Sequence, residues 1–433
     1  MFVTGRLPLL VALGAVPVVL LASAGVEPWI AAAGWIVLCA AITFADAAAA
    51  ADPRAIRVQR RVPGRALLGQ QVQTELWLHN AGSRRVRGRI RDAWQPTAGA
   101  PGDRPLIDIP GGERRSVPVP LLPRRRGELS SEFVVARSDG PLRLAGRQTR
   151  IQARGALRVL PPFTARRHLP SRLARLRELD GNTSVQVRGQ GTEFDSLREY
   201  VRGDDVRSID WRATARAGTT MLRTWRPERD RHVVIVIDTG RTAAARVGDG
   251  VRLDAAMEAA LLLAALAGRA GDHTHLLMFD RVTRARVTRI DGPALLPALV
   301  DAMAPVEPQL IDTDWDAAFA QVRAITSRPS LVVLLTAQDA PEAARGFLGS
   351  LPGLSRRAHV LVGTVTDTEP TSTERSDAAA VYLAAAAERA ARDAARVSAA
   401  IGRAGAEAVS DSPESLPPRI ADRYLELKAT GRL

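Results

Sequence analysis

Two uninterrupted apolar stretches at the start of the chain constrain its fold most. Residues 7–24 and 29–45 contain no charged side chain, and only residues 25–28 separate them. Each stretch is close to the lower limit of the about 17–25 residues with which a helix crosses the hydrocarbon core of a bilayer. We therefore predict a hairpin of two transmembrane helices over residues 1–48.

A cleaved signal peptide is the competing interpretation of the first stretch. Arg6 would be its basic start, residues 7–21 its apolar core and Ala22-Ser23-Ala24 its cleavage site. The second stretch would still anchor the mature chain in that case. A hairpin buried in a soluble core is disfavoured because neither stretch has a polar face.

The distribution of positive charge predicts the orientation of the anchor. The connecting turn has no Arg or Lys, whereas Arg54, Arg57, Arg60 and Arg61 closely follow the second stretch. The positive-inside rule then places the soluble part of this multi-pass cell-membrane protein in the cytoplasm.

The composition excludes several classes of protein. The net charge is +14, but acids and arginines are interspersed, so we expect no nucleic-acid binding. Arginines near the membrane could instead meet anionic lipid head groups. Lys428 is the single lysine, so neither a P-loop nor a protein-kinase site can be built. The single cysteine, Cys39, excludes an internal disulfide and a zinc site made of cysteines.

Residues 55–165 show the period-two pattern of β-strands. Val72, Thr74, Leu76 and Leu78 alternate with side chains of the other face, and similar alternation surrounds residues 117–121 and residues 133–135. Turn signals lie between these runs at residues 79–82, 110–112 and 138–141. Short alternating runs at this spacing predict an antiparallel β-sandwich-like domain of immunoglobulin-like kind.

The segment 180–230 contains the most distinctive motif, GQGTEFDSLREYVRGDDVRSIDWRATAR at residues 189–216. Acids and arginines alternate here around Phe194, Leu197, Tyr200, Ile209 and Trp211, and we expect these apolar side chains to insert into a neighbouring core. Carboxylates with an arginine nearby are expected to form internal ion pairs. A catalytic interpretation would instead use Glu193, Asp204, Asp205 and Asp210 as metal or acid–base groups.

Residues 231–412 predict a doubly wound α/β domain, and residues 413–433 are set apart as a C-terminal tail. The continuous apolar run 233–237 is typical of a strand buried on both faces. Further strands are expected at 275–279, 282–290, 331–335 and 359–365, and helices at 253–270, 293–303, 315–325 and 377–401. Ligands of such sheets lie at the carboxyl ends of the strands. His273 and His275 have a spacing that two metal ligands could use, but an ordinary strand start is the simpler interpretation.

The motif of residues 189–216 resembles the domain-of-unknown-function 58 family. The matching elements are Gly-x-Gly-x-Glu-Phe at 189–194, Leu-Arg-x-Tyr at 197–200, Gly-Asp-Asp at 203–205, Arg-x-Ile-Asp-Trp at 207–211 and Ala-x-Ala-Arg at 213–216. The resemblance implies a membrane protein with a von Willebrand factor A-like C-terminal domain. It also implies a link to MoxR-type AAA ATPases and a role in complex assembly or envelope processes.

The von Willebrand A likeness directs attention to Asp238-Thr239-Gly240-Arg241-Thr242 after the first strand. Domains of that kind place Asp-x-Ser-x-Ser here to hold Mg²⁺, which prefers oxygen ligands. This chain keeps Asp238 and Thr242, but Gly240 replaces the first serine. Thr313 and Asp339 are the candidates for the remaining ligands. A bound Mg²⁺ and a metal-free, degenerate metal-ion-dependent adhesion site both stay open at this point.

These observations predict a membrane-anchored, non-enzymatic adaptor or scaffold that binds partner proteins. A metal-dependent hydrolase that uses Asp238 with the carboxylates of the motif is the alternative, and a purely structural membrane module is a third. We expect partners to dock on residues that belong to the motif: Gly191, Glu193, Phe194, Leu197, Arg198, Tyr200, Gly203, Asp204, Asp205, Arg207, Ile209, Asp210, Trp211 and Arg216.

Overall fold

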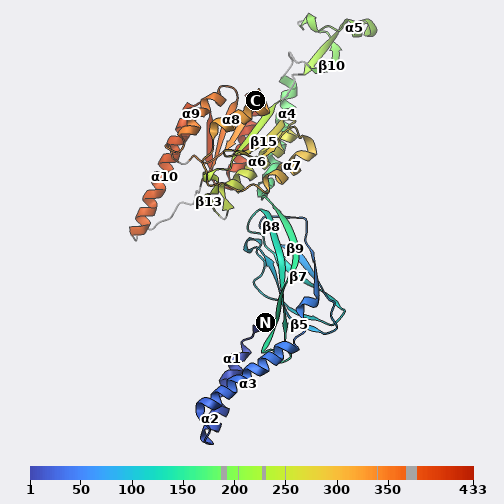
Figure 1. Cartoon of the computed structure of the whole chain (residues 1–433). Helices are drawn as coiled ribbons and strands as arrows, with labels where there is room; N and C mark the ends of the chain where they lie inside the picture. Colours follow the sequence, from blue (N-terminus) through green and yellow to red (C-terminus); the bar gives the residue numbers. More distant parts are fainter. Residues whose placement is uncertain (187–192, 203, 227–230, 249, 339, 367–377) are drawn as a thin grey trace. The chain divides into compact units, whose positions relative to one another are not determined.

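The computed structural model describes residues 1–186, 193–202, 204–226, 231–248, 250–338, 340–366 and 378–433 (Figure 1). The chain divides into two compact units, Met1–Leu160 and Pro161–Leu433. The first unit holds the apolar helices and a β domain. The second holds an α/β domain and the motif at residues 189–216.

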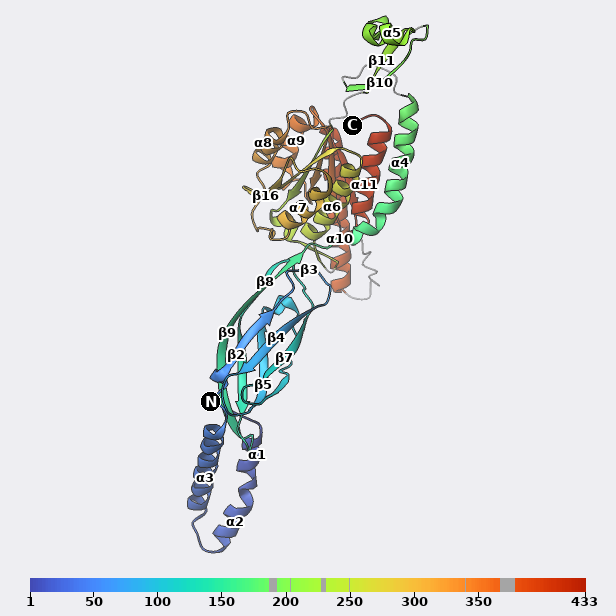
Figure 2. The ribbon, with the colours of Figure 1, turned by 90° about the vertical axis from the view of Figure 1, so that its right-hand side faces the viewer.

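The apolar stretches form helices, as their composition predicts. The three helices are α1 (Arg6–Leu13), α2 (Ala15–Ser23) and α3 (Pro28–Ala49) (Figure 2). Gly14 separates α1 from α2, and a Cβ atom there would lie 2.0 Å from Nε1 of Trp35, so only glycine allows this close approach. Two helical segments, Arg6–Ser23 and Pro28–Ala55, are long and apolar enough to cross a membrane.

Both ends of the hairpin are tied to the β domain. Before α1, strand β1 (Phe2–Val3) pairs with β9 (Ala145–Leu160). At the end of α3, the buried carboxylate of Asp46 accepts hydrogen bonds of 2.7–3.0 Å from three backbone amides, those of Leu142, Leu144 and Ala145. Helix α3 therefore ends at Ala49, one residue beyond the predicted boundary, and its last turn contacts residues 142–145, whose amides are partners for the buried acid.

The β domain is built from two sheets around a shared apolar core. One sheet has the order β1-β9-β8-β5-β6, with β3 added beside β9, and the other has the order β2-β4-β7. The remaining strands are β2 (Ile56–Arg61), β3 (Arg65–Leu67), β4 (Val72–Asn80), β5 (Val86–Trp94), β6 (Leu106–Ile109), β7 (Arg114–Leu121) and β8 (Gly127–Asp139). Leu76 and Leu78 of one sheet share a buried cluster with Ile90 and Val134 of the other.

A bulge in β8 reverses the face that the alternation around residues 133–135 predicts. The pairing of β8 with β9 shifts between Ser131 and Phe133, so Val134 and Ala136 point into the core instead. Phe133 lies on the outer face, where the guanidinium of Arg150 stands 5.1 Å from its ring centre. One extra residue exchanges the faces of a strand because side chains alternate with a period of two.

The second unit contains the doubly wound α/β domain, as predicted. Its sheet has the order β16-β15-β12-β17-β18-β19, in which β16 alone is antiparallel to its neighbour. These strands are β12 (His232–Asp238), β15 (His273–Phe279), β16 (Thr283–Val287), β17 (Leu331–Leu335), β18 (His359–Val365) and β19 (Glu407–Asp411). The apolar run at 233–237 thus becomes a central strand, and Asp238 ends it at the carboxyl edge.

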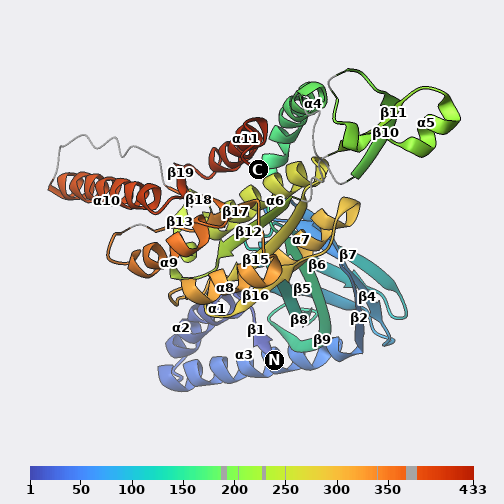
Figure 3. The ribbon, with the colours of Figure 1, turned by 90° about the horizontal axis from the view of Figure 1, so that it is seen from above.

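Helices cover both faces of this sheet (Figure 3). One face is covered by α6 (Arg252–Arg269), α7 (Leu295–Met303) and α11 (Leu416–Ala429), with α4 (Leu169–Gln186) against them. The other is covered by α8 (Trp315–Ile325), α9 (Arg345–Ser355) and α10 (Ala378–Arg403).

The last residues form α11 and are not a tail outside the α/β domain. Ile420 and Tyr424 of this helix are fully buried in the core. The single lysine, Lys428, is buried beside Asp272 with 3.2 Å between Nζ and Oδ1. The sequence pattern of α11 does not reveal the helix, because many charged residues surround its narrow apolar face.

Candidate functional site

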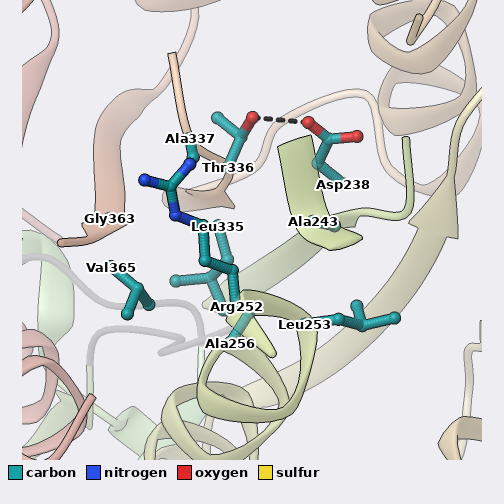
Figure 4. A pocket seen from close by; sticks show the side chains of 10 residues that line it. All are labelled: Asp238, Ala243, Arg252, Leu253, Ala256, Leu335, Thr336, Ala337, Gly363 and Val365. Carbon is teal, nitrogen blue, oxygen red and sulfur yellow. Dashed lines mark hydrogen bonds between the residues drawn. The ribbon is translucent and has the colours of Figure 1, made fainter. Parts of the chain in front are cut away.

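The carboxylate of Asp238 is the centre of a group of hydroxyl side chains at the carboxyl edge of the sheet. It accepts hydrogen bonds from the Gly240 amide (2.8 Å) and from the hydroxyls of Thr313 (2.5 Å), Thr336 (2.6 Å) and Thr242 (3.4 Å). Figure 4 shows the bond between Asp238 and Thr336. We call these five residues the Asp238 cluster. Burial raises the pKa of Asp238, and the four hydrogen bonds oppose that rise.

Three of the four residues proposed as metal ligands therefore meet in space. Asp238, Thr242 and Thr313 are in direct contact, although 75 residues separate the first from the last. Asp339 lies outside the described residues. Thr336, which the sequence analysis does not single out, also contacts the carboxylate, and its only signal in the sequence is a hydroxyl directly after the buried strand 331–335.

Gly240 is required by the packing of the cluster. A Cβ atom at this position would lie 2.4 Å from Oγ1 of Thr313 and 2.9 Å from the carbonyl oxygen of Ile311. A serine at residue 240 would therefore displace the Thr313 hydroxyl from Asp238. The neighbouring Arg241 forms an ion pair with Asp312, with 3.1 Å between guanidinium and carboxylate. Asp312 is therefore not free to act as a metal ligand.

The space beside the cluster is small and carries a positive charge. A cavity of about 20 Å³ lies between Asp238, Leu335 and Gly363, which is room for about one water molecule. Arg252 of α6 also lines it, and Figure 4 shows its guanidinium on the side of Thr336 and Ala337. Among the described residues, a single carboxylate held by four donors and facing an arginine fits a resident Mg²⁺ poorly.

The acid that follows the neighbouring strand β15 also has hydrogen-bond partners within the protein. Asp280, after β15, accepts hydrogen bonds from the Thr239 hydroxyl (3.0 Å) and the Arg284 guanidinium (2.7 Å). Burial raises its pKa, but these bonds and two from backbone amides outweigh the burial and lower it overall. Asp280 therefore remains an ionised structural group that joins two strand ends.

The described part of the motif folds together with the strand that follows it, and we call residues 193–202 and 204–226 the signature module. Strand β10 (Glu193–Glu199) pairs antiparallel with β11 (Met221–Arg226), and helix α5 (Trp211–Ala217) lies between them in sequence. Gly191 and Gly203 lie outside the described residues, and nothing is described of the side chains of Glu193 and Phe194.

The described part of the signature module contains two ion pairs and two capping carboxylates. Arg198 donates to Asp204 (2.7 Å), and Arg223 donates to Asp210 (2.7 Å). Asp210 also caps α5 by accepting from the amides of Arg212 and Ala213, and these amides together with Arg223 lower its pKa. Asp205 accepts from the amide of Arg207 (3.0 Å). Such contacts are those of ion pairs and caps that hold a loop in shape.

The apolar side chains of the signature module correct one expectation. Trp211 is 70% exposed and Leu197 is 40% exposed, so neither inserts into a neighbouring core. Tyr200 and Ile209 are half-buried, and Arg216 is exposed. Trp211 is the first residue of α5 and directly follows the Asp210 cap. Val201 (62%) and Val206 (60%) are exposed as well.

The histidines of the α/β domain gather at the opposite, amino edge of the sheet. His232 lies between His273 and His275, with ring centres 5.2 Å from each, and its Nδ1 is 3.0 Å from Nε2 of His275. Burial, followed by the charge of His232, lowers the pKa of His275 to about 4. Within the described residues no group of three or more His, Cys, Asp or Glu side chains has an arrangement that could hold a metal ion.

The chain is a multidomain protein. It combines a helical hairpin long and apolar enough to cross a membrane, a two-sheet β domain and a doubly wound α/β domain. Residues 196–400 match the family described as "Protein of unknown function DUF58", which supports the resemblance that the motif predicts. No curated protein matches the sequence.

Several solved structures are similar to parts of the chain at low sequence identity. The VWA domain of SpRpn10 is 11% identical, covers 45% of this chain and 94% of its own length, and has a TM-score of 0.30. The CARDB domain of a Pyrococcus furiosus protein, solved with di-metal ions, is 14% identical over 24% of this chain and 91% of its own length, with a TM-score of 0.18. The ASH/PapD-like domain of human CEP192 is 15% identical over 25% of this chain and 89% of its own length, with a TM-score of 0.17. Such scores do not establish a shared fold.

Proposed function

We propose that this protein is a membrane-anchored, non-enzymatic scaffold whose signature module docks a partner protein. The observation that carries the proposal is that four apolar side chains of this small module are each exposed: Leu197, Val201, Val206 and Trp211. Two acids of the same module, Asp204 and Asp210, are paired with the arginines Arg198 and Arg223. A surface with a large aromatic side chain surrounded by satisfied charges is the usual composition of an energetic centre in a protein interface.

The candidate carboxylates already have hydrogen-bond partners within the protein, which supports a binding role over a hydrolytic one. Asp204 and Asp210 hold the signature module together, and Asp238 is held by four donors beside a cavity that takes about one water. A general base needs a position within hydrogen-bond reach of a substrate proton. In this proposal the Asp238 cluster works without Mg²⁺ and stabilises the carboxyl edge of the sheet.

The ties between the hairpin and the β domain support an uncleaved anchor. Strand β1 precedes the first apolar helix and pairs with β9, and the Thr4 hydroxyl donates to the carbonyl oxygen of Arg143. Cleavage after the first helix would remove this strand from the sheet. With both ends of the hairpin on one side, the arginines at 54–61 support a cytoplasmic location of the soluble units.

The family resemblance suggests a MoxR-type AAA ATPase as the partner, in complex assembly or an envelope process. The test uses the full-length protein in mild detergent with a purified MoxR-type ATPase of the same cell, and Trp211→Ala as the variant. Loss of an interface centre of this kind weakens binding by about 2 kcal/mol, which is about thirtyfold in Kd. Tyr382→Ala, at an equally exposed aromatic residue of α10, is the matched control.

Two results decide between the roles. Binding that Trp211→Ala weakens and Tyr382→Ala leaves unchanged supports the signature module as the docking surface. Equal binding by wild type and Trp211→Ala, or turnover of a hydrolase substrate that Asp238→Ala abolishes, contradicts the proposal.

A further inference from the structure

A hollow of about 750 Å³ lies in the first unit, where both ends of the apolar hairpin join the β domain. Strands β1, β5, β6 and β8 and the segment around residue 143 form its walls. It contains five arginines and two acids, and we call it the arginine hollow. Its charged side chains are Arg6, Arg87, Arg89, Arg137, Arg143, Asp108 and Asp139.

The positive charge of the arginine hollow is not balanced by its own acids. Asp108 is already shared between Arg85 and Arg87. Within the described part of the chain, no carboxylate forms an ion pair with Arg6, Arg89 or Arg143. The hollow therefore has an excess of positive charge, with five arginines against Asp139 and an Asp108 that is shared with Arg85 outside the lining.

The strand register concentrates this charge further. Arg89 of β5 lies directly opposite Arg137 of β8 in the antiparallel pair, and like charges in that position destabilise a sheet. Burial, together with the charges of Arg104 and Arg89, lowers the pKa of Arg137. Phe2 fixes the Arg137 guanidinium, whose carbon lies 4.8 Å from the ring centre. An anion between the two arginines would turn this repulsion into attraction.

The rim of the hollow indicates where that anion comes from. Thr4, Gly5 and Arg6 line the hollow, and Arg6 is the first residue of an apolar segment long enough to cross a bilayer. Val3 and Leu106 also line it and are exposed, at 52% and 75%. Arginines beside exposed apolar side chains at the end of such a helix have the composition of a surface that lies at the level of lipid head groups.

We infer that the arginine hollow binds the phosphate of an anionic phospholipid head group, while Val3 and Leu106 contact the start of its acyl chains. Guanidinium groups suit this ligand because their planar forks donate two parallel hydrogen bonds to phosphate oxygens. The inference rests on the membrane anchor of the proposed function. It adds a lipid-binding site that orients the β domain against the bilayer.

The test compares the full-length protein with two double variants in vesicles of equal parts phosphatidylcholine and phosphatidylglycerol. Arg89→Gln with Arg143→Gln removes two charges from the hollow, at exposed side chains. Arg115→Gln with Arg154→Gln removes two charges from exposed positions of the same unit that do not line the hollow. Native mass spectrometry after mild detergent extraction counts the lipids that stay bound.

We expect wild type and the control variant to retain phosphatidylglycerol in preference to phosphatidylcholine. The hollow variant should retain it about thirtyfold more weakly, since each arginine near a membrane surface contributes roughly a factor of five. An equal preference in the hollow variant, or none in wild type, overturns the inference.

Two further measurements separate the sources of phosphate and the two proposals. Calorimetry with inorganic phosphate in discs of pure phosphatidylcholine detects a site for soluble phosphate. Phosphate binding that the hollow variant loses, without a preference for phosphatidylglycerol, overturns the assignment to lipid. Extraction with alkaline carbonate tests the anchor itself: release of the chain contradicts the proposed function, whereas retention without lipid preference contradicts only this inference.

Discussion

Replacing Asp238 with alanine tests whether the Asp238 cluster is a structural element. The substitution leaves four donors without their acceptor. Two of them, the Gly240 amide and the Thr336 hydroxyl, are buried, and a buried donor without a partner costs about 1–3 kcal/mol. Thr242 and Thr313 are partly exposed and can turn to water. Because two buried donors lose their acceptor, we expect the free energy of unfolding to fall by about 4 kcal/mol from this effect alone.

The desolvation of the carboxylate offsets part of this loss. Burial raises the pKa of Asp238, which means that the ionised group is itself unfavourable in the folded state, and alanine removes that cost. We therefore expect the free energy of unfolding to fall by about 3 kcal/mol. For a domain of this size that is a decrease of roughly 6–12 °C in Tm.

The assay is thermal unfolding of the full-length protein in mild detergent, followed by circular dichroism with and without millimolar Mg²⁺. Glu414→Ala, at an exposed position of the same unit, is the control and should change Tm by less than about 1 °C. A decrease below about 2 °C for Asp238→Ala would refute the structural role. A rise in the Tm of wild type with Mg²⁺ that Asp238→Ala abolishes would show that the carboxylate is a metal ligand instead.

The remaining predictions concern charges buried elsewhere. The folded chain holds the pKa of His275 at about 4 against 6.5 in the unfolded chain, so only the unfolded chain binds this proton between those values. The free energy of unfolding should therefore fall by up to about 3 kcal/mol from pH 6.5 to pH 4, and His275→Gln should flatten that dependence in urea titrations. Asp92→Asn leaves Arg60 buried without its ionic partner and should cost about 3–5 kcal/mol by denaturant unfolding. Asp46→Ala leaves three backbone amides without an acceptor and should accelerate their hydrogen exchange by about tenfold or more.

Each of these predictions has a matched control variant and an outcome that would contradict it. His273→Gln, at a more exposed ring of the same cluster, should keep most of the pH dependence. Asp108→Asn, an exposed ion pair of the same β domain, should cost less than about 1 kcal/mol. Asp52→Ala should leave the exchange of amides 142–145 unchanged. A pH dependence that survives His275→Gln, or variants indistinguishable from their controls, would contradict the assigned contacts.

Sequence patterns predict the elements of this protein well where burial is uniform along an element. The run 233–237 is apolar throughout because a central parallel strand is covered on both faces, and the structure places it at the centre of the sheet. The apolar helices follow from the same reasoning. Hydrophobic periodicity does not predict the buried face of β8, because one inserted residue reverses it. It also does not predict α11, because the narrow apolar stripe of this helix lies among charged residues.

The candidate site could be predicted only in part from the sequence. Asp238 and its position at the carboxyl edge follow from strand composition and the rule that parallel strands end at one edge. The contact with Thr336 does not, because it joins residues 98 positions apart through the crossover that places β17 beside β12. The exposure of Trp211 does not follow from its local composition either, because a large aromatic residue in that pattern predicts burial.

The sequence by itself therefore determined the family resemblance, the two apolar helices, the kind of domain that follows and the acid at the edge of the sheet. These properties depend on residue type and local period, which the chain carries along its length. Only the tertiary structure decided which hydroxyls hold Asp238, how Asp46 ties the hairpin to the β domain and how five arginines come to share one hollow. Those contacts join residues far apart in the chain, and strand register and packing, not local pattern, bring them within bonding distance.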